Sequence, residues 1–495
     1  MFTEHYAHWI DGRPSPINPS ARIERLSPAH DVLVATYAAG TVAETEKAIA
    51  AARRAFDHGP WPSLPGADRA AVLQRTAALI RENAEALARI ETLESGKPIG
   101  QARDEMAWAA GIWDYAAALA RTLHGDSTNT IGSNQLGFTL KEPVGVVALI
   151  TPWNFPLLIV SQKLPFALAA GCTCVVKPSE FTSGTTLRLA RLLQEAGLPD
   201  GVCNVVTGYG EPVGRVLAEH REVDKVSFTG STAVGRKIVA ASHGNLKRVA
   251  LELGGKNPQV IFPDADLDAA ADAVVFGIYF NAGECCNSGS RVLLHRAIAD
   301  SFLERVAARA RTLPVGDPLD ERTKMGAIVN EAQFDRILDC IASGTREGAR
   351  LLLGGKRLGS GPGRFIEPTI FTDVTASMRI AREEIFGPVL SALCFDTTDE
   401  AIRLANSTAY GLSAAVWTRD VDRMLTCARG IRAGTIWGNT IMEGGCELPF
   451  GGYGQSGIGR ELGPDALEPF TETKTVMLHL GPRKNLWHQP PDSAS

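Results

Sequence analysis

Between residues 144 and 253, short apolar runs of strand length alternate with segments of helical periodicity, and this alternation restricts the folds open to the chain. In most of these runs the apolar residues are consecutive rather than alternating, so both faces of the strands should be buried. Buried strands separated by helices predict a parallel sheet covered on both sides, which is a doubly wound α/β domain. The five expected strands are Val144–Ile150, Cys172–Lys177, Cys203–Val206, Lys225–Phe228 and Val249–Leu253.

Helical segments connect these strands, and two long ones precede them. In a doubly wound domain, ligands bind at the carboxyl ends of the strands, so the residues that follow each strand are the first candidates for a site. Ser231 follows the fourth strand and is a suitable N-cap for the next helix. The expected helices are Val42–Phe56, Arg69–Gly96, Leu157–Ala170, Thr182–Ala196, Val213–Glu219 and Ser231–His243.

A second α/β unit is expected from about Gly255, beginning with the strand Gln259–Phe262. It lies outside the first sheet pattern but repeats the alternation of strand and helix signals. The helices expected in it are Asp264–Phe280, Ala297–Leu313, Thr397–Ala405 and Asp420–Gly430.

A third, smaller element is predicted from two distant segments. The Ser/Thr/Asn/Gly-rich stretch Gly125–Gly137 predicts a loop leading into a projecting strand, Gly137–Lys141, and Val476–Leu480 would complete the element. We therefore expect a first domain of residues 1–124 and 144–254, and a second of residues 255–455. Residues 125–143 and 456–495 would form the bridging element and a polar tail.

The bulk composition excludes several classes of partner. The chain has 495 residues, enough for two or three domains, with 50 basic and 55 acidic side chains and a net charge of −5. No segment concentrates basic charge, so neither nucleic acid nor an anionic membrane surface is an expected partner. No apolar run approaches the ~18 residues of a membrane span, and the polar start does not resemble a secretory signal.

The nine cysteines indicate a reducing compartment. Their number is odd, and several lie inside apolar runs, so reduced thiols in a cytoplasm are expected rather than a disulfide framework. Cys172 and Cys174 alternate on a predicted strand and should face the same core. No CxxC or HExxH motif occurs, so no metal site is expected.

Three segments place reactive or hydrogen-bonding side chains in turns. Cys285 and Cys286 lie in a Gly-rich turn after a helix, Glu252 ends a strand just before two glycines, and Asn154 follows the first strand of the sheet. Each also has a simpler interpretation. A free Cys is commonly a small buried hydrophobe, a strand-end carboxylate can face solvent, and Asn between prolines favours a turn.

Taken together, these segments resemble the aldehyde dehydrogenase superfamily. Further motifs of that family occur in its order and spacing, so the resemblance spans residues 151–463. It implies NAD-dependent oxidation of an aldehyde to the carboxylic acid, by a doubly wound cofactor domain, a second α/β catalytic domain and a small β oligomerisation element. The further motifs are Lys177-Pro-Ser-Glu180, Phe228–Gly235, Glu383–Val389, Pro449–Tyr453 and Ser456–Gly463.

The resemblance assigns the chemistry to three residues. Cys286 resembles the nucleophile, whose thiolate attacks the aldehyde carbon and later carries the acyl group as a thioester. Asn154 resembles the side-chain half of an oxyanion hole, with the backbone N–H of Cys286 as the other half. Glu252 resembles the general base that activates the hydrolytic water. A carboxylate at an apolar strand end should have a raised pKa, which suits that task.

The resemblance also assigns the cofactor site. Glu180 should accept hydrogen bonds from the adenosine ribose, so NAD is expected to be preferred to NADP, which carries a phosphate there. Gly230 and Ser231 begin a helix, which offers free N–H groups to the pyrophosphate. The residues expected to bind NAD are Thr151, Pro152, Trp153, Lys177, Ser179, Glu180, Gly230, Ser231, Leu253, Glu384 and Phe386.

The sequence departs from the common family pattern at a few positions. Glu284 stands where Gln is usual, Gly454 where Lys is common, and Gln162 where many relatives that take hydrophobic or betaine aldehydes have Trp. None of these departures touches the predicted chemistry. Glu443 and Glu447 lie in the segment that resembles the aldehyde tunnel. They could favour cationic or polar aldehydes, or they could be rim charges that face solvent.

Two alternatives remain at this point. A CoA-acylating member would transfer the acyl group to CoA, but thiolysis needs no water-activating base and therefore leaves Glu252 unexplained. A catalytically retired relative, acting as a structural or binding protein, would have no reason to keep Cys286, Glu252 and Asn154 together. The favoured interpretation is a cytoplasmic homodimer or homotetramer that acts on a small-molecule aldehyde, with the bridging element pairing subunits by strand addition.

Overall fold

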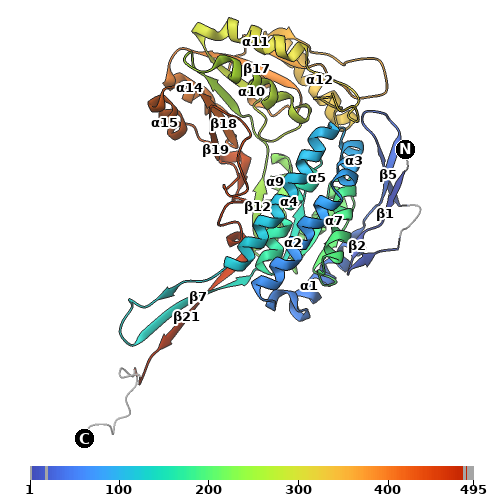
Figure 1. Cartoon of the computed structure of the whole chain (residues 1–495), viewed down its shortest axis with the longest axis vertical. Helices are drawn as coiled ribbons and strands as arrows, with labels where there is room; N and C mark the ends of the chain where they lie inside the picture. The colour runs from blue at the N-terminus through green and yellow to red at the C-terminus, as the bar shows by residue number, and fades with distance from the viewer. Residues whose placement is uncertain (1–2, 17–20, 483–486, 488–495) are drawn as a thin grey trace.

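The computed structural model describes residues 3–16, 21–482 and 487, and shows two sheet-based lobes with a long β arm (Figure 1). The predicted fold class is confirmed. The first sheet has the strand order β20-β12-β11-β8-β9-β10-β2-β3. Its five central strands, β12, β11, β8, β9 and β10, all run parallel to one another. Its strands are β8 Val146–Ile150, β9 Thr173–Lys177, β10 Cys203–Val205, β11 Lys225–Thr229, β12 Arg248–Glu252, β2 Trp9–Ile10, β3 Arg13–Pro14 and β20 Gly457–Ile458.

The strand order of this sheet reverses beside β8. From β8 the chain continues to β9 and β10 on one side, and then returns to β11 and β12 on the other. The carboxyl ends of β8 and β11 therefore flank a topological switch point, where open α/β sheets bind their ligands.

Both faces of the first sheet are covered by helices, as the consecutive apolar residues predicted. Along β8, Val147 and Leu149 face one core, and Val146, Ala148 and Ile150 face the other. The larger core lies under α2 Gly66–Glu82, α3 Ala84–Ser95, α4 Ile99–Thr122, α5 Pro156–Ser161, α6 Leu164–Ala170 and α7 Gly184–Glu195. The smaller core lies under α1 Val42–His58, α8 Arg215–Glu219 and α9 Thr232–Ala241.

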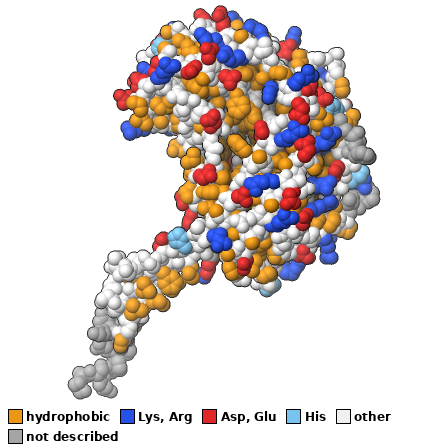
Figure 2. Space-filling model, in the orientation of Figure 1, with side chains coloured by type: hydrophobic (Ala, Val, Ile, Leu, Met, Phe, Trp, Pro, Cys, Tyr) orange, Lys and Arg blue, Asp and Glu red, His pale blue; other side chains and the backbone are white. Residues whose placement is uncertain are grey.

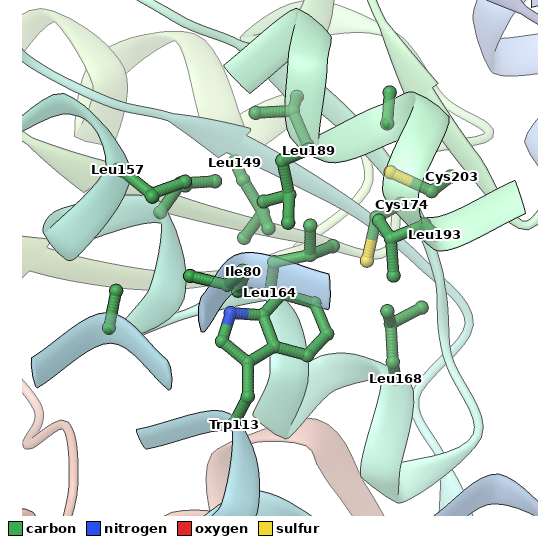
Figure 3. Packing of buried hydrophobic residues seen from close by; sticks show 14 of the residues in the cluster. Ile80, Trp113, Leu149, Leu157, Leu164, Leu168, Cys174, Leu189, Leu193 and Cys203 are labelled. Carbon is green, nitrogen blue, oxygen red and sulfur yellow. The ribbon is translucent and has the colours of Figure 1, made fainter. Parts of the chain in front are cut away.

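Trp113 of α4 lies at the centre of the larger core. Figure 3 shows its indole ring near Ile80 and Leu164, with Leu149 of the sheet behind them. The buried indole N–H donates to Ser161 Oγ at 3.0 Å, so the one polar atom of the ring is satisfied. Cys172 and Cys174 both belong to this core, which confirms that they face the same way.

The second lobe contains a seven-stranded sheet of order β15-β16-β17-β14-β13-β18-β19, in which only β15 runs antiparallel to its neighbour. Its strands are β13 Pro258–Ile261, β14 Arg291–His295, β15 Arg350–Leu353, β16 Thr369–Thr372, β17 Val389–Phe395, β18 Ser413–Trp417 and β19 Thr435–Gly438. Its helices are α10 Leu267–Tyr279, α11 Ala299–Arg311, α12 Glu331–Arg346, α13 Arg379–Arg382, α14 Thr398–Ala405 and α15 Val421–Gly430.

The arm is an antiparallel ribbon that extends away from both lobes (Figure 1). It pairs β7, Gln135–Pro143, with β21, Thr471–His479, over their full lengths, and β6, Ser127–Thr128, adds to the far side of β7. Both strands predicted for this element are present and longer than expected. Most of the predicted tail, 481–495, lies outside the described residues. A further small sheet at the start of the chain contains β1 Glu4–Tyr6, β4 Arg22–Leu26 and β5 Leu33–Ala38.

Several predicted helices differ from the observed ones. The helix expected over Leu157–Ala170 is two helices, α5 and α6, because Pro165 lacks the N–H that would continue the first one. The helix expected over Arg69–Gly96 is also divided, at Asn83. Two long helices, α4 and α12, were not predicted. After the second sheet, β20 pairs with β12, so residues 457–458 return to the first sheet before the arm.

Candidate active site

A cavity of about 170 Å³ lies between the two lobes, at the carboxyl ends of β8, β11 and β12. This is the switch point of the first sheet, closed from the other side by residues of the second lobe. Most of the predicted site residues line it, including all three assigned to the chemistry. The lining residues are Pro152, Trp153, Asn154, Thr229, Gly230, Ser231, Glu252, Leu253, Gly254, Cys286, Gln333, Arg336, Glu384 and Phe386.

The loop that carries Cys286 has an unusual backbone. Asn281, Ala282 and Gly283 adopt φ values of 50°, 55° and 73°, so three consecutive residues are left-handed just before Glu284. For a residue with a side chain this conformation costs roughly 1–2 kcal/mol, and it persists only where the surroundings hold it. The required contacts are present: the Asn281 side chain donates to the backbone carbonyls of Asn154, at 3.2 Å, and Glu284, at 3.1 Å.

Cys286 and Cys285 have different surroundings. Cys286 is half-buried and lines the cavity, and its backbone carbonyl accepts a hydrogen bond from Asn257 Nδ2 at 2.9 Å. Cys285 is buried, and its thiol donates to Asn287 Oδ1 at 2.8 Å. A hydrogen bond to the Cys286 sulfur, together with burial, holds the pKa of the Cys285 thiol well above its ordinary value. Of the two thiols, Cys286 is the one that a molecule in the cavity can reach.

Asn154 is fixed beside the same loop. Its side chain is almost completely buried, and Nδ2 donates to the carbonyl oxygen of Glu284 at 3.1 Å. An amide nitrogen carries two hydrogens, so one donor orients the group and the other is available toward the cavity.

Glu252 ends β12 and also lines the cavity. The carboxyl group is buried, and Oε2 has no hydrogen-bond partner among the described residues. Burial, and next the charge of Glu461, hold the pKa of Glu252 well above its ordinary value, while Lys163 opposes this effect. Lys163 and Glu461 form a buried ion pair. A carboxyl group with a raised pKa is a stronger base when ionised than an exposed carboxylate, which suits it to accept a proton from water.

The end of the cavity near the second lobe is shaped for a polar ligand. Glu384 Oε1 accepts the backbone N–H of Gly255 at 3.1 Å, and burial raises the pKa of Glu384 to about 7. A Cβ atom at Gly254 would overlap the Glu384 carboxylate, so only glycine leaves this space open. Phe386 packs edge-on against Trp153, with 5.3 Å between the ring centroids. Aromatic walls beside a half-buried carboxylate fit a nicotinamide ring and its ribose hydroxyls.

The opposite end is formed by the start of α9. Ser231 is its N-cap, and Oγ accepts the N–H of Val234 at 3.3 Å. Gly230 has no room for a side chain, because a Cβ atom there would press on the Phe228 ring. The helix therefore presents its free N–H groups at the cavity wall, which suits a pyrophosphate.

Lys177 ends β9, and Ser179 and Glu180 follow it. None of the three lines this cavity, nor does Thr151. The Lys177 ammonium is buried 3.7 Å from Glu180 Oε2. Burial lowers the pKa of Lys177, and Glu180 partly offsets the shift. These residues lie at the carboxyl end of the strand next to β8, so a ligand longer than the cavity could extend to them.

The sequence did not point to Gln333 and Arg336, which come from the unpredicted helix α12. Gln333 Nε2 donates to the carbonyl of Phe386 at 2.7 Å, and Arg336 donates to that of Glu384 at 2.7 Å. Asn257 was not among the predicted site residues either. Its amide donates to Cys286 and Ser288, and its oxygen accepts from Ser413 N at 3.1 Å. These are contacts between distant segments, which no local pattern encodes.

The departures from the family pattern have a structural role. Glu284 is buried, and Oε1 accepts the N–H of Val329 at 3.2 Å. Burial holds the pKa of Glu284 well above its ordinary value. Gly454 has φ +57°, which disfavours a side chain. Glu443 and Glu447 are both exposed, as expected for rim charges.

A doubly wound sheet with a cavity at its switch point, closed by a second lobe that contributes a thiol, defines a dinucleotide-dependent oxidoreductase. The model of the aldehyde dehydrogenase family matches residues 17–476, and the chain belongs to this family. It is 47% identical over 475 residues to aldehyde dehydrogenase family 2 member C4 of Arabidopsis thaliana, which covers 95% of this chain and 94% of the relative.

Solved structures agree with this assignment. An NAD-dependent aldehyde dehydrogenase from Sinorhizobium meliloti superposes with a TM-score of 0.97 at 51% identity, covering 98% of this chain and 96% of that one. A betaine aldehyde dehydrogenase from Staphylococcus aureus, in complex with NAD+, gives a TM-score of 0.95 at 39% identity, covering 98% and 96%. The protein is an NAD-dependent aldehyde dehydrogenase. Within the described part of the chain, no helix is long and apolar enough to cross a bilayer.

Proposed function

We propose that this protein oxidises its aldehyde through a covalent intermediate on Cys286 and hydrolyses that intermediate with water activated by Glu252. The observation that carries the proposal is convergence. Cys286, Asn154 and Glu252 come from three separate segments, and all of them line the cavity that Glu384 and Phe386 also border. A general base, a nucleophile and an amide donor in one cavity are the parts that two-step acyl transfer requires.

In the first step, the Cys286 thiolate adds to the aldehyde carbon and gives a thiohemiacetal. The free hydrogen of Asn154 Nδ2 and the backbone N–H of Cys286 would stabilise the oxygen on which negative charge develops. When bound, NAD would supply the hydride acceptor, and loss of the hydride from the carbon would leave a thioester on Cys286. The protonated Cys285 beside it would not compete as a nucleophile.

In the second step, water attacks the thioester and the carboxylic acid leaves. Glu252 Oε2, which lacks a protein partner among the described residues, would accept the proton from that water. The raised pKa of Glu252 makes it a stronger base than an exposed carboxylate once it is ionised.

We propose that NAD is held along the carboxyl ends of β9, β8 and β11. Glu384, Phe386, Trp153 and Leu253 would contact its nicotinamide half. Gly230 and Ser231 would bind the pyrophosphate through the start of α9. Lys177, Ser179 and Glu180 would contact the adenosine ribose, and Thr151 and Pro152 the segment between.

We further propose that the arm joins subunits in a cytoplasmic homodimer or homotetramer. The strand β21 is an edge of its sheet, so a strand of another copy can add to it. Figure 2 shows hydrophobic side chains gathered along the arm. The exposed ones include Ile131, Leu140, Met477 and Leu478. A Met477→Asp variant should shift the protein to a smaller species in light scattering, and an unchanged mass would contradict this use of the arm.

We also propose a function for each part of the chain. Residues 1–124 and 144–254 would hold NAD, residues 255–455 would supply the nucleophile, and residues 125–143 and 456–495 would contain the bridging element. All nine thiols are free, which supports a reducing compartment.

An NADH-release screen tests the proposed function. Aliphatic, aromatic, amino-substituted and acid-substituted aldehydes should be assayed with NAD, in the wild type and in Cys286→Ala. The proposal expects NADH with the substrate class of the enzyme and none from Cys286→Ala. Equal NADH formation by both proteins would show that the thiol is not the nucleophile.

A further inference from the structure

Side chains of α4 belong to a polar network that reaches the loop before Cys286 and has no part in the two reaction steps described above. We propose that Gln101 and Glu105 are positioning residues for the first chemical step. They hold the backbone of Asn281, and through it the nucleophile loop and the Asn154 amide. This inference rests on the proposed function of Cys286 and Asn154.

The contacts form a continuous chain from α4 to the loop. Gln101 Oε1 accepts the backbone N–H of Asn281 at 3.2 Å, and Gln101 Nε2 donates to Glu105 Oε1 at 2.8 Å. Asn281 in turn donates from its side chain to the carbonyls of Asn154 and Glu284. Gln101 is therefore one hydrogen bond away from Asn281, whose side chain links the backbone of Asn154 to that of Glu284, two residues before Cys286.

A buried ion cluster fixes Glu105. Lys97 donates to Glu105 Oε2 and, at 2.7 Å, to Glu91 Oε1. The Lys97 and Glu91 side chains are fully buried, and that of Glu105 is 5% exposed. The other oxygen of Glu91 accepts the backbone N–H of Leu157 at 3.3 Å. One end of the cluster thus contacts the segment just after Asn154, and the other end reaches the loop before Cys286.

The aromatic residues around the cluster join the same two segments. Lys97 Nζ lies 4.7 Å from the centre of the Phe155 ring, and Phe155 stacks on Phe280 with a centroid distance of 6.1 Å. Phe155 follows Asn154, and Phe280 precedes Asn281. The two segments are therefore held together by stacking as well as by hydrogen bonds.

Packing alone does not account for this network. Apolar side chains of the same volume commonly stabilise a protein as well as buried charges do, so a buried ion cluster is weak evidence for stability. Here the network accepts hydrogen bonds from two backbone N–H groups, those of Leu157 and Asn281, that form no hydrogen bond within a helix. One belongs to the first turn of α5 and the other to the left-handed residue Asn281. Both groups adjoin residues that the proposed chemistry requires to be placed accurately.

The test removes both hydrogen bonds of Gln101 and then restores them, with the donor and acceptor of the bond between positions 101 and 105 exchanged. Gln101→Met has a similar volume but neither donor nor acceptor. In the double variant Gln101→Glu/Glu105→Gln, the new carboxylate accepts from Asn281 N and from the new amide, and the total charge is unchanged. Arg103→Met is the matched control, because Arg103 lies on the same helix but forms exposed ion pairs with Glu85 and Glu321.

The measurements are the single-turnover rate constant of NADH formation, with enzyme in excess over aldehyde, and the Kd for NAD. A misplacement of about 1 Å can cost ~10²-fold in rate, so the single-turnover rate constant of Gln101→Met should be about 10- to 100-fold lower than that of wild type. Its Kd for NAD should stay within about twofold of the wild-type value. The double variant should recover to within about threefold, and Arg103→Met should match wild type. If Gln101→Met fails to fold, Gln101→Asn, which is too short to reach Asn281, has the same expected result.

The inference is overturned if the variant at position 101 keeps the wild-type rate constant. It is also overturned if rate and NAD affinity fall together, or if the double variant is no faster than Gln101→Met. Cys286→Ala, measured in parallel, separates this outcome from failure of the proposed function. NADH formation that persists in Cys286→Ala would refute the proposed function itself.

Discussion

The side-chain amide of Asn154 donates to the backbone carbonyl of Glu284 at 3.1 Å, although the two residues are 130 positions apart in the chain. This bond uses one of the two amide hydrogens, and the other remains for the proposed oxyanion in the cavity that Asn154 and Cys286 both line. Asn154→Ala should therefore slow single-turnover NADH formation by ~10²–10³-fold, the usual cost of losing one oxyanion donor. Asn83→Ala, an exposed position between α2 and α3, is the control. A rate within about threefold of wild type in Asn154→Ala would exclude the assigned role.

The two adjacent thiols should respond differently to substitution. Cys286 lines the cavity, whereas Cys285 is buried and its pKa is held high. Cys286→Ala should abolish aldehyde oxidation, and Cys285→Ala should keep most of it. Peptide mapping after brief treatment with iodoacetamide should find the label on Cys286. A reversed pattern in either experiment would assign the nucleophile to Cys285.

The pH dependence of deacylation should report on Glu252. A general base acts only in its ionised form, and the pKa of Glu252 is held well above its ordinary value by burial and by Glu461. Thioester hydrolysis should therefore rise with pH through that raised pKa and fall away below it. Glu461→Gln removes the second cause, so the acid limb should move to lower pH.

Stopped-flow NADH traces at a series of pH values give this profile, provided that deacylation limits turnover. Glu195→Gln, an exposed glutamate at the end of α7, is the control and should leave the limb in place. A limb that moves to higher pH in Glu461→Gln would mean that Glu461 does not act on Glu252 through its charge.

Cofactor preference should depend on Glu180. NADP would place a phosphate with a charge of roughly −1.5 to −2 near this carboxylate, while Lys177, 3.7 Å from Glu180, would offset part of the repulsion. We expect kcat/KM to favour NAD by ~10²-fold, equivalent to about 3 kcal/mol, and Glu180→Gln to narrow the gap. Equal efficiencies in the wild type, or no gain for NADP in the variant, would remove Glu180 from this role.

The fold class could be predicted because its signal is local. Consecutive apolar residues in β8 and β9 indicate burial on both faces, and this burial is observed. The predicted helix boundaries were less accurate. Pro165, which cannot donate a backbone hydrogen bond, marks the break between α5 and α6 that the prediction did not include. The helix α4 was missed because many of its buried positions are alanines, such as Ala102, Ala109 and Ala116, which give little apolar contrast along the sequence.

Only those site residues that belong to short sequence motifs could be predicted. The residues that would carry the chemistry stand in short motifs, so their resemblance to a family could be recognised. The groups that fix them could not be recognised in this way. Gln101 reaches Asn281 across 180 positions, and Asn257 reaches Ser413 across 156. The first contact depends on how the two lobes pack, and the second on the pairing of β13 with β18. No pattern within either segment encodes them.

The most direct test of the central claim is the mass of a trapped acyl-enzyme. Glu252→Gln, mixed with NAD and a substrate aldehyde, should form NADH in one stoichiometric burst and then turn over very slowly, because the thioester is made but not hydrolysed. Intact-mass and peptide analysis should find the acyl group on Cys286. Steady turnover at the wild-type rate, or NADH formation without an adduct on Cys286, would contradict the account.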